Sequence, residues 1–63
     1  MDRQQLLDLM HAEAVKAGIR ALVVRGVSRR EALYSIIQAA QQNDENEIAC
    51  AASVMYEQEF ENN

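Results

Sequence analysis

The chain contains no proline and only two glycines, Gly18 and Gly26, among its 63 residues. Proline and glycine are the residues that most often end helices and mark turns, so this sequence favours long helices with few breaks. We predict an all-α fold with helices at about residues 2–25, 29–42 and 45–61. The second and third helices are expected to form a hairpin, within a single small helical domain that spans residues 1–63.

The first predicted helix carries an apolar stripe whose members recur in alternating steps of three and four residues. With Leu6 at its start, the stripe consists of Leu6, Leu7, Met10, Ala14, Ala17, Ala21 and Val24. Its three central alanines would let a facing helix approach closely. Val15, Ile19, Leu22 and Val23 are expected to widen it. A glycine inside a helix costs about 1 kcal/mol relative to alanine, and we predict that the helix continues through Gly18.

The second predicted helix has a clear start. Gly26 is suited to end the first helix in a left-handed conformation, and Ser28 with Glu31 has the spacing of a capping box. In that motif the serine hydroxyl accepts a hydrogen bond from the helix and the glutamate reaches back to the serine amide. The buried face is predicted to contain Leu33, Ile36, Ile37 and Ala40.

The third predicted helix is acidic and alanine-rich. Asp44 followed by Glu47 predicts its N-terminal cap. Cys50, which lies among alanines, is interpreted as a small packing residue. The favoured interpretation of the carboxylates of this helix is a solvated face near Lys16 and Arg20 of the first helix, with weak surface pairs. The alternative is an anionic surface that docks on a basic partner or mimics nucleic acid, formed by Asp44, Glu45, Glu47, Glu57, Glu59 and Glu61. The apolar face is predicted to contain Ile48, Ala52, Met55, Tyr56 and Phe60.

The core available to one chain is small. Only 14 residues are Val, Ile or Leu and three are aromatic. Domains below roughly 70–80 residues seldom gain more than about 3–5 kcal/mol from one core without a disulfide, a metal or a partner chain. A helix over residues 2–25 would be about 36 Å long, whereas a compact chain of this length has a radius of gyration of about 11 Å. We therefore expect the overhanging stripe to be covered in a dimeric helical bundle.

Composition excludes several kinds of chemistry. A single cysteine cannot form an internal disulfide, and one histidine with one cysteine cannot complete a structural zinc site. His11 is interpreted as a solvated helix residue, and no nucleophile, metal or cofactor site is predicted. We expect no enzymatic activity. The sequence predicts neither a membrane span nor a secretory signal, and a cytoplasmic location is expected.

Charge is distributed unevenly along the chain, whose net charge is −4. Residues 1–31 carry six basic and four acidic side chains, and residues 32–63 carry six acidic side chains and no basic one. This balance argues against a general nucleic-acid binder. The leading hypothesis is a protein interaction module, such as an inhibitor, adaptor or small regulator, that acts as a helical homodimer. Its partner protein is not indicated. The charged residues expected to take part in contacts are Arg25, Arg29, Arg30, Glu57 and Glu61.

The alternative hypothesis rests on residues 21–37. A helix, a Gly-Val-Ser turn and a second helix that opens with Arg29 and Arg30 resemble the helix-turn-helix motif of DNA-binding regulators. The resemblance implies that both arginines meet DNA and that Tyr34 or Ser28 contacts phosphate. In this interpretation nucleic acid would be the partner.

Overall fold

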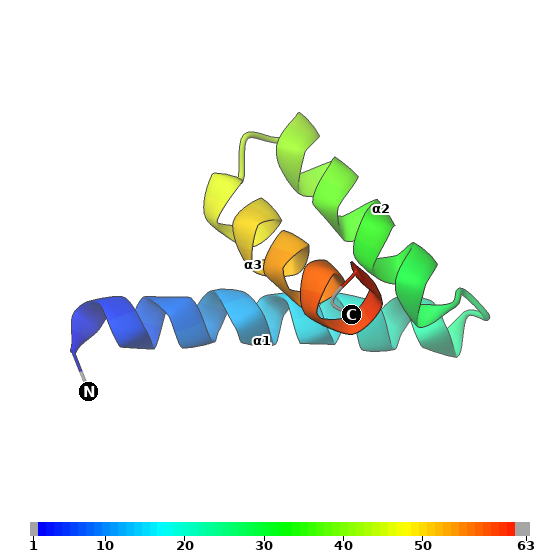
Figure 1. Cartoon of the computed structure of the whole chain (residues 1–63), viewed down its shortest axis with the longest axis horizontal. Coiled ribbons are helices and arrows are strands. Elements are labelled where there is room, and N and C mark those ends of the chain that lie inside the picture. The colour runs from blue at the N-terminus through cyan, green and yellow to red at the C-terminus, as the bar shows by residue number, and fades with distance from the viewer. Residues whose placement is uncertain (1, 62–63) are drawn as a thin grey trace.

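The computed structural model describes residues 2–61, and all regular structure in that range is helical (Figure 1). α1 covers Arg3–Val24, α2 covers Arg29–Gln42, α3 covers Asn46–Tyr56, and the π-helical turn η1 covers Glu57–Glu61. α2 and α3 run side by side as a hairpin that packs on one side of α1. The predicted all-helical class with three main helices is confirmed. The radius of gyration is 11.7 Å.

α1 is continuous through Gly18 and has specific ends. At its start the Asp2 carboxylate accepts a hydrogen bond from the Gln5 amide at 2.8 Å, and the Gln5 side chain accepts one from the Asp2 amide at 3.3 Å. This reciprocal pair is a capping box that sequence reasoning did not identify. At its end Gly26 adopts φ +95°, a left-handed conformation that glycine takes without strain. The Val27 amide then bonds the Leu22 carbonyl at 3.1 Å, which closes the last turn.

The cap predicted for α2 is present in part. The Ser28 hydroxyl accepts a hydrogen bond from the Glu31 amide at 3.2 Å. Among the side-chain hydrogen bonds of residues 2–61, the reciprocal bond from the Ser28 amide to the Glu31 carboxylate is not formed. Ser28 therefore acts as a simple N-cap residue.

The cap predicted for α3 is wrong. Asp44 has φ +58°, and the Glu45 amide reaches back to the Ala40 carbonyl at 2.8 Å. Asp44 is thus the left-handed residue that ends α2, a position that aspartate tolerates better than most non-glycine residues. The N-cap residue of α3 is Glu45, whose side chain makes no capping hydrogen bond. Regular α-helix ends at Tyr56 and not near residue 61, because the chain widens into η1.

The core lies where all three helices meet, and it is thin. Its centre, in which each residue is at most 1% exposed, consists of Val15, Ile19, Ala32, Leu33 and Ala52. A β-carbon added to Gly18 would lie 3.0 Å from Cδ1 of Ile36, so α1 and α2 approach closely at the glycine. The face predicted for α2 is at least partly buried, and in α3 Ile48, Ala52, Met55 and Tyr56 are too. Phe60 is the exception, because it is 36% exposed on η1.

Replacing Ser28 tests the start of α2. Ser28→Ala should lower the free energy of unfolding by about 0.5–2 kcal/mol, because the Glu31 amide loses its acceptor. Chemical denaturation followed by circular dichroism measures the change. Ser35→Ala is the control, since it removes an exposed hydroxyl from the interior of the same helix and should be neutral or slightly stabilising. Equal effects of the two substitutions would contradict the capping role.

Candidate interaction surfaces

α1 carries apolar residues on two opposite sides. Val15 and Ile19, each 1% exposed, face the hairpin, and Leu22 packs against them. Each residue turns a helix by about 100°, so the predicted stripe lies on the far side. The expectation that Val15, Ile19 and Leu22 widen this stripe is wrong. In the middle of α1 the hairpin covers the branched side chains and leaves the alanines outside, because burial of the branched side chains removes more apolar surface from water.

The predicted stripe is therefore an outer face of α1. Its alanines lie in the middle and its bulkier residues near the ends, with Leu6 51%, Met10 58% and Val24 86% exposed. Every member is exposed, namely Leu6, Leu7, Met10, Ala14, Ala17, Ala21 and Val24. In Figure 1 no other element lies below α1 on the side away from the hairpin. We call these seven residues the outer face of α1.

The first turns of α1 extend beyond the hairpin (Figure 1). Residues 3–10 are all exposed, and Leu9 adds a further apolar side chain that is 47% exposed. Single exposed apolar residues are ordinary, but a contiguous group is typical of a contact surface. The overhang expected from helix length is thus present, and it lies at the end of α1 that carries the bulkiest outer-face residues.

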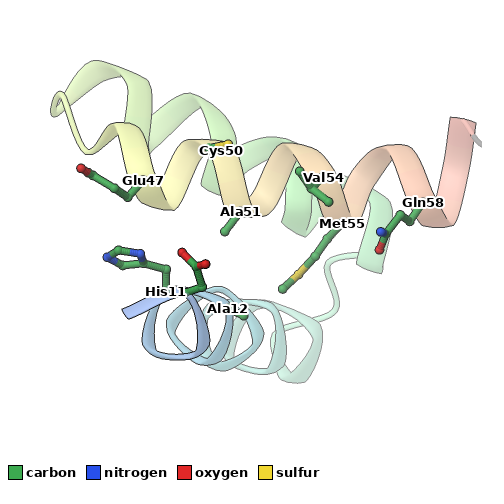
Figure 2. A pocket seen from close by; sticks show the side chains of 9 residues that line it. His11, Ala12, Glu47, Cys50, Ala51, Val54, Met55 and Gln58 are labelled. Atoms are coloured by element: carbon green, nitrogen blue, oxygen red, sulfur yellow. The ribbon is translucent and has the colours of Figure 1, made fainter. Parts of the chain in front are cut away.

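A groove of about 500 Å³ lies between α1 and α3. Figure 2 shows His11 of α1 opposite Glu47 of α3 at one end, while Met55 points from α3 toward α1. The lining consists of Asp8, His11, Ala12, Glu47, Cys50, Ala51, Val54, Met55 and Gln58. The structure of this groove corrects two interpretations of the sequence. Cys50 is exposed on the groove and is not a packing residue, and His11 is half-buried and not fully solvated.

The groove combines an apolar middle with polar ends. Ala51, Val54 and Met55 can contact apolar atoms, whereas Asp8 and Glu47 add negative charge. Within residues 2–61 no three His, Cys, Asp or Glu side chains are grouped so that they could hold a metal ion. The groove thus presents apolar atoms in its middle, with carboxylates beside them.

The charged residues at the start of α2 contact η1. Nε of Arg29 donates to Glu59 at 2.6 Å and Nη2 donates at 3.1 Å, so the pair is bidentate. The hydrogen bond from Arg29, with the attraction of its charge, lowers the pKa of Glu59. Nε of Arg30 donates to the Tyr56 hydroxyl at 2.9 Å, and its guanidinium lies 5.7 Å from the centre of the Tyr56 ring and 5.8 Å from that of Phe60. These contacts hold η1 against α2.

Only part of the predicted charged surface comes together. Glu59, which the sequence grouped with the other carboxylates of the third helix without indicating Arg29 as its partner, pairs with Arg29. Glu57 and Glu61 are exposed on η1, and Arg25 is the exposed C-cap residue of α1. The expected pairing of α3 carboxylates with Lys16 is wrong, because Lys16 pairs with Glu13 on its own helix at 3.5 Å. Glutamates occupy alternate positions of η1, so the sequence alone does not indicate which of them pairs with Arg29.

Comparisons with known protein families, with curated proteins and with solved structures found no match for this chain. The fold and surfaces define it as a small three-helix protein. Over residues 2–61, none of the helices combines the length and the apolar character needed to cross a bilayer.

Replacing Glu59 tests the contact between η1 and α2. Glu59→Gln should lower the free energy of unfolding at neutral pH by at most about 1 kcal/mol, because the pair is partly exposed. The lowered pKa of Glu59 stabilises the fold above its unfolded pKa, and this contribution is lost as pH falls through the folded value. The difference between variant and wild type should therefore shrink as the pH falls through the folded pKa of Glu59, which urea denaturation at neutral and at acidic pH measures. Glu57→Gln, which removes a nearby charge, is the control, and an equal loss there would contradict a specific pair.

Proposed function

We propose that this chain is a small, non-enzymatic protein interaction module that acts as a helical homodimer through the outer face of α1. One observation carries the proposal. Seven apolar or small residues share one side of the longest helix, opposite the core, and all of them are exposed. A solvated helix normally presents polar residues on that side.

The thin core supports the same proposal. Ile19, Leu33 and Val15 are the largest side chains that are fully buried. Apolar surface contributes roughly 25 cal/mol for each Å² removed from water, so covering Leu7, Met10 and Val24 adds stability that one chain lacks. A second copy would supply that cover, and the stability gained would rise with protein concentration.

A dimer built through the outer face of α1 leaves both hairpins free. Each hairpin presents the groove between α1 and α3, with Val54 46% exposed beside it. Two identical surfaces on one particle can engage a partner protein twice, which strengthens binding without new contacts. This arrangement suits an inhibitor, an adaptor or a small regulator.

The second hypothesis, a DNA-binding regulator, keeps one supporting observation. Arg29 and Arg30 lie in the first turn of α2, directly after a tight turn, and the Arg29 side chain remains 49% exposed. Against it stand the contacts that both guanidinium groups make with Glu59, Tyr56 and Phe60. The interaction module is therefore the function that we favour.

Light scattering tests the dimer. Wild-type protein should be dimeric at micromolar concentration, and Leu7→Glu with Met10→Glu should make it monomeric, because charges would then lie in the interface. Circular dichroism should be unchanged, since both residues are exposed in one chain. Ser35→Glu with Gln38→Glu on exposed positions of α2 is the control and should remain dimeric. A monomeric wild type would contradict the proposal.

Mobility-shift measurements test the second hypothesis. We expect wild-type protein to form no sequence-selective complex with duplex DNA at about 0.15 M salt, because its net charge of −4 opposes approach to a polyanion. A tight, salt-sensitive complex that Arg29→Gln with Arg30→Gln abolishes would instead favour the DNA-binding regulator. Lys16→Gln would be the control for the loss of a basic charge.

A further inference from the structure

We infer that the two copies of α1 pack antiparallel, with the two-fold axis between Ala14 and Ala17. The inference rests on the proposed function and specifies how the second copy binds. It is carried by two independent features of the outer face, the spacing of its residues and the charges along its edge.

The spacing of the outer face reads the same in both directions. From Leu7 to Val24 the steps are three, four, three, four and three residues, symmetric about a point between Ala14 and Ala17. An antiparallel partner therefore places an outer-face residue opposite each of these six residues, and Leu6 lies outside the symmetric set. The layers are Leu7 with Val24, Met10 with Ala21, and Ala14 with Ala17.

Side-chain size favours this order. In the antiparallel arrangement Met10 lies opposite an alanine, and the smallest layer, Ala14 with Ala17, lies at the axis where two helices approach most closely. A parallel arrangement would place Leu7 against Leu7 and Met10 against Met10, followed by three layers of alanine pairs. The helices would then be held apart at one end and leave voids at the alanines, which forfeits packing contacts.

Charge favours the same orientation. Glu13 directly precedes Ala14 and Arg20 directly precedes Ala21, so both flank the stripe on the same edge. In an antiparallel pair this edge meets its own copy, and Glu13 of each chain lies opposite Arg20 of the other. Glu13 also pairs with Lys16 at 3.5 Å, but its side chain is 61% exposed and remains accessible to a partner.

The parallel arrangement lacks these ion pairs. In a parallel pair, residues that directly precede an outer-face position lie opposite residues that directly follow one in the other chain. Arg20 of each chain, which precedes Ala21, then lies opposite Arg25 of the other, which follows Val24. Two like-charge contacts replace two attractive ones. In the antiparallel pair Arg25 lies opposite the neutral Gln4 instead. The charges of α1 thus discriminate between the two orientations of a second copy.

Charge reversal tests the orientation by the sign of its effect. Arg20→Glu should weaken the dimer by about 5- to 30-fold if the helices are antiparallel, because Glu13 would face a carboxylate. It should strengthen a parallel dimer. The double variant Glu13→Arg with Arg20→Glu should restore the wild-type dissociation constant to within about threefold, since the pair is re-formed with its signs exchanged. Ser35→Glu with Gln38→Glu, an equal change of two charges on exposed positions of α2, is the control and should alter the constant least.

Disulfide cross-linking gives a second, independent measurement. In chains with Cys50→Ser, Leu7→Cys should cross-link to Val24→Cys of a second chain when the two are mixed, and neither should cross-link to itself. Positions 7 and 7 of an antiparallel pair lie about 25 Å apart along the axis, far beyond disulfide reach. A dimer in which Leu7→Cys cross-links with itself would overturn the antiparallel orientation alone. A wild-type monomer would overturn the proposed function as well, and would indicate that a different protein covers the outer face.

Discussion

The close approach of the three helices at small residues is the contact on which the rest of the structure depends. Gly18 admits Ile36 at a distance that a side chain would obstruct, and Ala32 and Ala52 are fully buried. Close approach lets short helices interlock without large side chains, but it also limits the apolar surface that one chain buries. A core of this size contributes little burial in one chain, and the proposed second copy would add to it.

The two sides of α1 follow from this constraint. The hairpin is short, so it covers one side of α1 and leaves the first turns uncovered. It packs on Val15, Ile19 and Leu22, whose branched side chains fill the space above two alanine-containing helices. The outer face keeps its alanines between bulkier ends, a profile that matches an inverted copy of itself. The proposed dimer contact would thus use residues of α1 other than those that pack within the chain, and the two would not compete.

Sequence patterns predicted what depends on neighbouring residues and failed where distant residues decide. Helix existence and the Ser28 cap are local, and the burial of Leu33 follows from periodicity. Periodicity alone could not rank the two apolar sides of α1, because the choice depends on the hairpin. The partner of Arg29 was missed for the same reason, since Glu59 lies 30 residues away and reaches it through η1. The prediction that Asp44 caps α3 was wrong for a local reason. Aspartate is suited both to start a helix and to occupy a left-handed position, and here it does the second.

The distribution of charge explains how an acidic chain could still associate with itself. Residues 32–63 hold six acidic side chains and no basic one. The described part of this range belongs to the hairpin and η1, which lie across α1 from the outer face. Between Arg3 and Val24, by contrast, three basic and two acidic side chains leave α1 slightly positive. Contact through the outer faces, as proposed, would bring the least acidic helices together and leave the acidic hairpins outside the contact. Charges of the two hairpins that lie more than a screening length of about 8 Å apart would then repel each other only weakly.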